Sequence, residues 1–262
     1  MVGGGNMGAA LLGGLLSGGV LQPVRVAVVE RLAERRAELA GMFPGVLVTD
    51  TIPPCQAAVL AVKPPDVAAT ATAAVAAGAR RLLSIAAGIT TSTIRSAVGA
   101  GVDGAGIDVV RAMPNTPALV GDGVSAICAD DDSDPSALDW ADAILSAVGM
   151  VVRVDEEHFD AVTGLTGSGP AYLFAVAEAL IGAGRGVGLP DELLGPMVTR
   201  LMLGSARLLA ERGDPAALRR AVTSPGGTTA AGLAVFAERD LDGVIGAAVA
   251  AATERGRELG RT

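Results

Sequence analysis

The sequence predicts an α/β domain with an open, mostly parallel sheet, followed by a domain built only of helices. Up to Val154, short apolar runs alternate with helix-like segments, which is typical of β-α-β units. After Val154 the strand-like runs disappear, and long alanine- and leucine-rich segments follow. The length of 262 residues accommodates two domains, which we place at residues 1–155 and 156–262.

The strands of the first domain are predicted from short apolar runs that end in a polar residue or a turn. Residues 24–30 form a β-branched run ending in Glu30, and residues 57–62 are stopped by Lys63 and two prolines. The expected strands are 24–30, 46–48, 57–62, 81–88, 107–113 and 123–128, and the expected helices are 9–18, 31–42, 66–77, 91–98 and 136–148.

The second domain is predicted to be entirely helical, with helices at 171–183, 191–212, 215–222, 229–238 and 242–259. Residues 193–209 and 244–252 are apolar around most of the helix circumference, so these helices must be buried. About 100 residues cannot bury several such helices alone, and we therefore expect an intertwined homodimer.

Composition excludes several classes of function. A net charge of −8 and a pI near 4.7 argue against nucleic acid as a partner. The apolar residues 9–21 follow no basic residue and are too short to span a bilayer, so neither a signal peptide nor a membrane partner is expected. Cys55 and Cys128 indicate buried thiols in a reducing compartment, hence the cytoplasm. The acidic loop 130–135 is interpreted as a helix cap, and no metal is expected.

A glycine-rich loop opens the chain. Glycines 3, 5 and 8 satisfy G-x-G-x-x-G, in which a dinucleotide pyrophosphate approaches the backbone and the following helix N-terminus. The expected cofactor contacts here are Gly3, Gly4, Gly5, Asn6, Met7 and Gly8. Such a loop normally follows a central strand, but only Met1 and Val2 precede it. We expect this strand to be missing, its neighbours to be left unpaired, and codons for about six apolar residues to lie upstream.

Turns after other strands are expected to line the rest of the cleft, because ligands bind at the carboxyl ends of parallel strands. Lys63, the only lysine among 20 basic residues, and Asn115, one of two asparagines, lie in such turns. These expected cofactor contacts are Val62, Lys63, Pro64, Ala87, Gly88 and Asn115. Glu30 is placed to bind the ribose hydroxyls of NADH, whereas Arg31 is placed to bind the 2′-phosphate of NADPH, so the cofactor choice stays open.

Two small-residue loops, residues 163–172 and 222–229, each open a helix and are dense in hydroxyls and backbone amides. A helix N-terminus of this kind binds a carboxylate without a basic side chain. An amino-acid-like substrate is therefore expected in this acidic protein.

Together these stretches resemble the Δ1-pyrroline-5-carboxylate reductase family, which catalyses the last step of proline biosynthesis. The resemblance covers residues 3–8, 61–64, 86–88, 111–115, 160–163, 167–172 and 223–229. It implies a Rossmann-like N-terminal domain, an all-α dimerisation domain, and dimers that often assemble into decamers. Thr166 in place of a serine, and Ala237 in place of a polar residue, depart from the family pattern.

The resemblance also implies a reaction, in which NADPH, or NADH, delivers a hydride to the C=N carbon of 1-pyrroline-5-carboxylate to give L-proline. It implies that the substrate is bound by Ser168, Ser224, Gly226, Gly227, Thr228 and Thr229. Thr229 beside the ring nitrogen, and Glu156 close to the ring, are the implied catalytic residues. The lone His158 is expected at the surface.

Two alternatives stay open. A dimer that binds a dinucleotide without catalysis fits the missing strand. A related imine or β-hydroxyacid reductase fits the first domain but not the loop at residues 224–229.

Overall fold

The computed structural model describes residues 1–99 and 106–260. Contacts divide the chain into two compact units, the first holding residues 1–168 with those from 250 onward, and the second holding residues 169–249. The first unit therefore reaches beyond the boundary predicted at residue 155 and also takes up the end of the chain.

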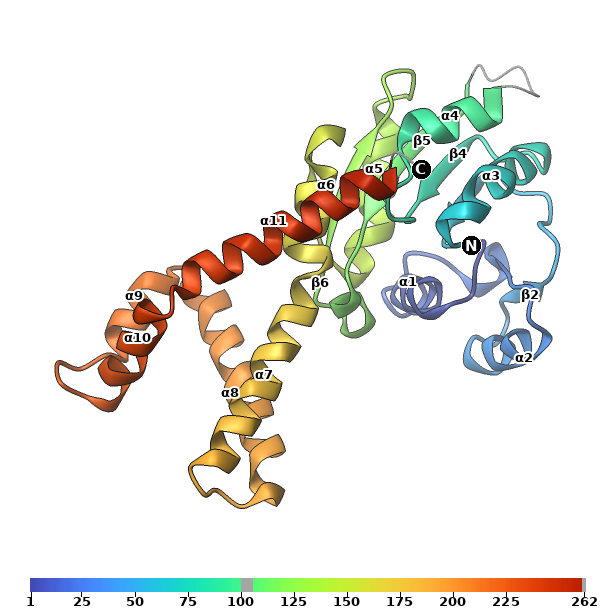
Figure 1. Ribbon diagram of the computed structural model, residues 1–262. Helices are drawn as coiled ribbons and strands as arrows, with labels where there is room; N and C mark the ends of the chain where they lie inside the picture. The colour runs from blue at the N-terminus through green and yellow to red at the C-terminus, as the bar shows by residue number, and fades with distance from the viewer. Residues whose placement is uncertain (100–105, 261–262) are drawn as a thin grey trace. The chain divides into compact units, whose positions relative to one another are not determined.

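The first unit alternates strands and helices (Figure 1). Its strands are β1 (Ala27–Val29), β2 (Leu47–Thr49), β3 (Ala57–Leu60), β4 (Arg81–Ser84), β5 (Asp108–Met113), β6 (Gly123–Ala129) and β7 (Gly149–Arg153). Its α-helices are α1 (Asn6–Ser17), α2 (Ala33–Met42), α3 (Val67–Ala76), α4 (Thr91–Gly99), α5 (Ser136–Leu145) and α6 (Phe159–Val162). Short 3₁₀ turns are η1 (Pro23–Arg25), η2 (Pro64–Asp66), η3 (Thr116–Val120), η4 (Ser146–Val148) and η5 (Glu156–His158), and η6 (Thr163–Gly167) is a π-helix.

The sheet is mostly parallel, as predicted. Strands β3, β4 and β5 pair in parallel, β5 pairs antiparallel with β6, and β6 pairs in parallel with β7. Strands β1 and β2 form a separate parallel pair. Strand β7 has no counterpart among the predicted strands, since its run of two valines is too short to stand out from the sequence.

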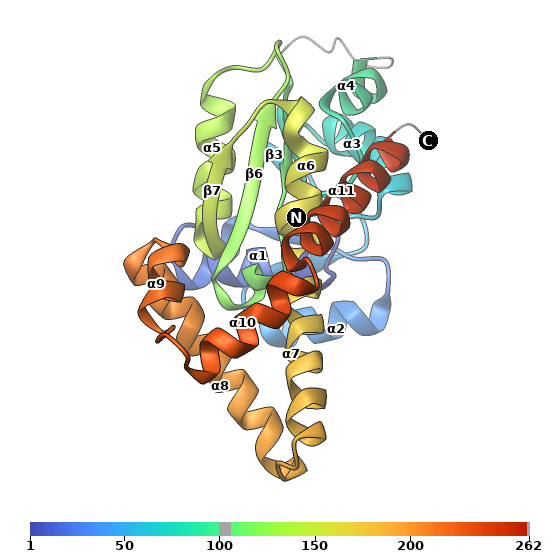
Figure 2. The ribbon, with the colours of Figure 1, turned by 60° about the vertical axis from the view of Figure 1, so that its left-hand side comes forward.

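Helices cover both faces of the five-stranded sheet, and its buried side chains alternate between them. Leu82 and Val109 pack in one cluster with residues of α3 and α4. Their neighbours Leu83 and Val110 pack in another with residues of α1 and α5. In Figure 2, α5 lies beside β6 and β7, in agreement with their contacts.

Residues 1–3 join the two parts of the sheet. Val2 forms isolated parallel bridges to Val29 of β1 and to Leu60 of β3. The Val2 amide donates to the Val59 carbonyl at 2.8 Å, and the Ala61 amide donates to the Val2 carbonyl at 2.7 Å. The expectation that the neighbouring strands are left unpaired is therefore wrong at their carboxyl ends.

The other end of this central position is open. A cavity of about 550 Å³ lies beside Met1, lined by Val26 and Ala27 on one side and by Ala57 and Val59 on the other. Burial lowers the pKa of the Met1 ammonium to about 6, and this group donates to the Ala27 carbonyl at 2.9 Å. Only the part of the central strand position that leads into the glycine loop is filled by Met1 and Val2.

The second unit consists of helices, as predicted. These are α7 (Gly169–Gly186), α8 (Asp191–Arg212), α9 (Pro215–Ala221), α10 (Thr228–Glu238) and α11 (Leu241–Gly260), the last of which continues into the first unit. Helices α7 and α8 lie side by side (Figures 1 and 2). Apart from Leu194 and Val198 of α8, none of the described residues of α7 to α10 is buried. Large apolar side chains such as Phe174, Leu201 and Phe236 are exposed.

Within residues 1–99 and 106–260, no helix combines the length and the apolar run needed to cross a membrane.

Candidate functional site

The glycine loop is shaped by close backbone contacts. Gly3 has a φ of +103°, and a Cβ atom there would lie 2.3 Å from the Ala61 carbonyl oxygen. A Cβ atom at Gly8 would lie 2.2 Å from the Gly3 carbonyl oxygen. At Gly5, by contrast, a Cβ atom would meet open space. Gly3 and Gly8 are therefore required to fold the loop, whereas Gly5 leaves room for a ligand.

Helix α1 begins at Asn6, inside the glycine motif and three residues earlier than predicted. Gly5 is its N-cap and supplies no capping side chain, so the amides of the first turn are available to a ligand. Gly5 and Asn6 are exposed. An uncapped helix N-terminus beside a glycine turn is a binding site for a phosphate group.

Glu30 holds the neighbouring loop together through both carboxylate oxygens. Oε2 accepts from the Gly4 amide at 3.1 Å, and Oε1 accepts from the Leu32 amide at 3.0 Å. Arg35 donates to the Gly4 carbonyl, and Arg36 donates to the carbonyls of Glu30 and Arg31. Glu30, Arg35 and Arg36 are therefore committed to the shape of the loop.

Arg31 differs from these two arginines because its side chain is 82% exposed. Its partner is Asp66, 3.3 Å away in the turn η2 that follows β3. An exposed ion pair of this kind contributes about 0–1 kcal/mol, so a phosphate can displace it at little cost. Arg31 is thus the arginine best placed to receive an anion at the end of β1.

The turns after β3 and β4 complete this edge of the sheet. Lys63 and Pro64 are exposed at the start of η2, and the Lys63 side chain has no ion-pair partner within residues 1–99 and 106–260. After β4, Ala87 is exposed and Gly88 has a φ of +77°. These turns follow strands parallel to one another, so they lie at the same edge as the glycine loop.

Asn115 follows β5, and its side-chain amide is buried and bonds to backbone groups of the protein. It is 8% exposed, its Nδ2 donates to the Thr166 carbonyl at 3.0 Å, and its Oδ1 accepts from the Val124 amide at 2.8 Å. The cofactor contact expected for Asn115 stays a prediction, and the side-chain amide already has partners at both ends.

Glu156 is the acceptor in a cluster with Thr91 and Arg111. Its Oε1 accepts from the Thr91 amide at 2.9 Å and from Arg111 Nη1 at 3.1 Å, and its Oε2 accepts from Thr91 Oγ1 at 2.7 Å. The Arg111 guanidinium also lies 4.5 Å from the centroid of the Phe159 ring. The catalytic role expected for Glu156 stays a prediction, and its carboxylate is oriented by these bonds.

Thr91 and Arg111 were not among the residues predicted for the site. A signal was present, because Arg111 lies in the interior of a mostly apolar strand at 107–113. A buried guanidinium requires a paired acceptor, so an acidic partner elsewhere in the chain was to be expected.

The second unit carries the loop expected to bind a carboxylate. Ser224, Gly226, Thr228 and Thr229 are exposed, and Gly226 has a φ of +69°. Gly227 is the N-cap of α10 and supplies no side chain, so the first amides of this helix are available. A Cβ atom at Gly227 would lie 2.4 Å from Ser224 Oγ and 3.1 Å from the Ser224 carbonyl oxygen, so a larger residue here would displace the Ser224 hydroxyl.

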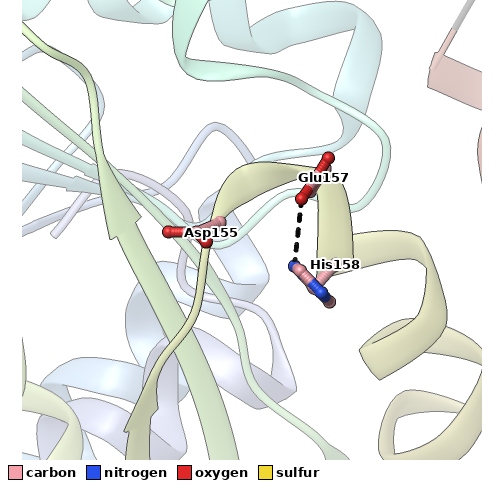
Figure 3. Close-up of side chains that lie close together, drawn as sticks. All are labelled: Asp155, Glu157 and His158. Carbon is pink, nitrogen blue, oxygen red and sulfur yellow. Dashed lines mark ion pairs between the residues drawn. The ribbon is translucent and has the colours of Figure 1, made fainter.

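Asp155, Glu157 and His158 form an exposed group at the surface (Figure 3). Their potential ligand atoms lie within 4.8 Å of one another, and His158 Nδ1 lies 3.9 Å from Glu157 Oε1. The surface position expected for His158 is confirmed. Exposed acidic groups are common without an ion, so this arrangement alone does not establish a metal site.

The two cysteines differ in burial. Cys128 is buried, and this burial raises the pKa of its thiol to about 12. Cys55 is only partly buried, contrary to expectation, because it lies at the edge of the cavity beside Met1.

Comparisons with known proteins match both parts of the chain. Residues 156–259 match the pyrroline-5-carboxylate reductase dimerisation family, and residues 1–88 match the family of coenzyme F420-dependent NADP oxidoreductases. The pyrroline-5-carboxylate reductase of Synechocystis is 39% identical over 100% of this chain and 97% of its own. That of Mycobacterium tuberculosis H37Rv is 39% identical over 99% of this chain and 95% of its own.

The chain belongs to the pyrroline-5-carboxylate reductase family. Solved structures agree: the reductase from Coxiella burnetii has a TM-score of 0.89 and 32% identity, covering 100% of this chain and 97% of its own. The Plasmodium falciparum reductase, solved with NADP bound, has a TM-score of 0.82 and 25% identity, covering 99% and 96%. The predicted fold class, a Rossmann-like domain followed by a helical dimerisation domain, is confirmed.

The open space at Gly5 leads to a prediction for two glycine variants. Gly8→Ala should lower the free energy of unfolding by about 1–3 kcal/mol through its clash with the Gly3 carbonyl, and should weaken NADPH binding as well. Gly5→Ala should keep the melting temperature of the parent chain and still weaken NADPH binding, because the methyl group would occupy ligand space. Thermal melts and fluorescence titration with NADPH measure both effects. Unchanged NADPH binding in Gly5→Ala would show that the pyrophosphate does not approach this glycine.

Proposed function

We propose that the chain is a pyrroline-5-carboxylate reductase, which reduces the C=N bond of 1-pyrroline-5-carboxylate to give L-proline. Full-length relatives at 39% identity, named for this activity, carry the proposal. Two features of the structure support it. The glycine loop and the uncapped start of α1 are suited to a pyrophosphate, and the uncapped start of α10 is suited to a carboxylate.

The dinucleotide is assigned to one edge of the sheet in the first unit. Residues 3–5, Arg31, 62–64, Ala87 and Gly88 lie in loops and turns at one edge of the sheet, and residues 6–8 form the start of α1. Bound NAD(P)H would supply the hydride, and the protein's part is to hold and orient it against the substrate. Glu30 would act on this site through the loop that it holds, whereas both ends of the Asn115 side-chain amide bond to other segments of the chain.

The substrate contacts are proposed from the loop before α10. The hydroxyl of Ser224, the backbone of Gly226 and Gly227, and Thr228 would bind the carboxylate, with Ser168 as a further contact. Thr229 would hydrogen-bond the ring nitrogen. When the imine binds already protonated, the carbon takes the hydride and the nitrogen keeps its proton, so a histidine acid is not required.

NADPH is the proposed cofactor, with NADH as the second. Arg31 supports NADPH, since an exposed guanidinium at the end of β1 is suited to a 2′-phosphate. Both oxygens of Glu30 already accept backbone amides, which weakens the case for a ribose contact and hence for NADH.

A homodimer is supported by the family match over residues 156–259 and by the exposed apolar helices of the second unit. Their apolar side chains need a partner surface to leave water. Assembly of these dimers into larger particles such as decamers, and a cytoplasmic location, are further parts of the proposal.

The decisive experiment is a reduction assay on the 262-residue chain with 1-pyrroline-5-carboxylate and either cofactor. The proposal expects one NADPH oxidised for each L-proline formed, with a higher kcat/KM for NADPH than for NADH. Tight NADPH binding without proline formation would instead support a dinucleotide-binding dimer that lacks catalysis.

Replacing Thr229 tests the substrate contact. Thr229→Val should lower kcat/KM for pyrroline-5-carboxylate by about 10- to 100-fold, because it removes a hydrogen bond to a charged group. The Kd for NADPH should stay unchanged, and Thr229→Ser, which keeps the hydroxyl, should retain most of the activity. Unchanged kcat/KM in Thr229→Val would remove Thr229 from the mechanism.

Replacing Arg31 tests cofactor choice. Arg31→Ala should raise the KM for NADPH by about 10-fold or more while leaving the KM for NADH near its starting value, because only NADPH has the 2′-phosphate. Arg80→Ala is the matched control, since Arg80 is exposed just before β4, at the opposite edge of the sheet. Equal losses with both cofactors would contradict phosphate recognition by Arg31.

A further inference from the structure

Two buried polar side chains stand near the end of β5 and reach the same segment of the chain. Arg111 is 5% exposed and Asn115 is 8% exposed. Both bond to residues of the segment 156–168, which contains η5, α6 and the π-helix η6. Buried polar groups at two points along one short segment fix both its position and its orientation.

Arg111 holds the beginning of the segment. Its Nη1 donates to Glu156 Oε1, and its guanidinium stacks on Phe159, a fully buried ring. Glu156 in turn accepts both the amide and the hydroxyl of Thr91, at the start of α4. The beginning of the segment is thereby tied to β5 and to the helix that follows the Ala87–Gly88 turn.

Asn115 holds the end of the segment. Its Nδ2 donates to the carbonyl of Thr166, and Oδ1 accepts the Val124 amide at the start of β6. Thr166 lies in the π-helix η6, a rare backbone form that is frequent at functional sites. The next residue, Gly167, lies against β5, where an added Cβ atom would be 2.8 Å from Met113 Cε.

We propose that Arg111 and Asn115 are positioning residues that fix the segment 156–168, and with it Ser168, for substrate binding. This inference rests on the proposed function, in which Ser168 contacts the substrate. The Ser168 amide donates to the Thr163 carbonyl at 2.8 Å, so the π-helix determines where Ser168 lies. The role differs from the cofactor contact expected for Asn115, because it acts on the substrate and not on NADPH.

The test is Asn115→Asp, which keeps the shape of the side chain. One carboxylate oxygen can still accept the Val124 amide, but the other faces the Thr166 carbonyl without a proton to donate. We expect kcat/KM for pyrroline-5-carboxylate to fall by about 10- to 100-fold with a raised KM, while the Kd for NADPH changes by less than about two-fold. Amide hydrogen exchange of residues 163–168 should accelerate in the same variant.

Two further variants guard against a general loss of stability. Ile127→Val removes one methylene from a fully buried residue of β6, and it should lower the melting temperature without altering exchange at 163–168 or either kinetic constant. Arg111→Lys keeps the charge facing Glu156 but loses the planar group stacked on Phe159. In Arg111→Lys, kcat/KM should fall and the Kd for NADPH should hold as in Asn115→Asp, but the faster amide exchange should appear at residues 156–162. This variant keeps the test available if Asn115→Asp does not fold.

The outcomes separate the possible roles. A weakened NADPH Kd with unchanged exchange at 163–168 would overturn the proposal and make Asn115 a cofactor contact. Unchanged exchange and kinetics would overturn it as well. If the parent chain forms no proline, the proposed function fails, and faster exchange at 163–168 in Asn115→Asp alone would still establish the anchoring of this segment.

Discussion

The structure depends on the backbone hydrogen bonds of its first three residues. Met1, Val2 and Gly3 bond to β1 on one side and to β3 and Ala61 on the other, and they are the described residues that bridge the two parts of the sheet. The same residues lead into the glycine loop, so the contacts that join the sheet also fix the shape of the proposed phosphate site. Because an unpaired buried amide costs about 1–3 kcal/mol, these few bonds strongly favour one arrangement.

A buried guanidinium and a buried side-chain amide fix the segment 156–168 against β5. Arg111 and Asn115 stand in or just after a strand whose other side chains are mostly apolar, and each is satisfied by a residue far along the chain.

The acidic net charge of the protein does not conflict with the binding of two anions. Both proposed anion sites use helix amides, and Arg31 is the one exposed guanidinium that we assign to a ligand.

Much of the fold could be predicted because it follows from periodic apolar runs. The strands at 57–60 and 108–113, the helices α3 and α8, and the glycine loop all have strong local patterns. Strand β7 and the π-helix η6 could not be predicted, since a short strand and a π turn are decided by pairing and packing with distant residues. The hydrogen bonds from the backbone to the Glu30 and Asn115 side chains could not be predicted for a similar reason. Their residue types suggested ligand contacts, and only the fold shows the backbone groups that they hold.

Residues 1–3 thus join the two parts of the sheet and preform the glycine loop. Site-resolved amide hydrogen exchange tests this most directly, because the amides of Gly3, Val29 and Ala61 donate across this junction. We predict that all three amides are protected in the free chain and exchange still more slowly with NADPH. Exchange at unprotected rates, while the amides of β4 and β5 remain protected, would contradict it.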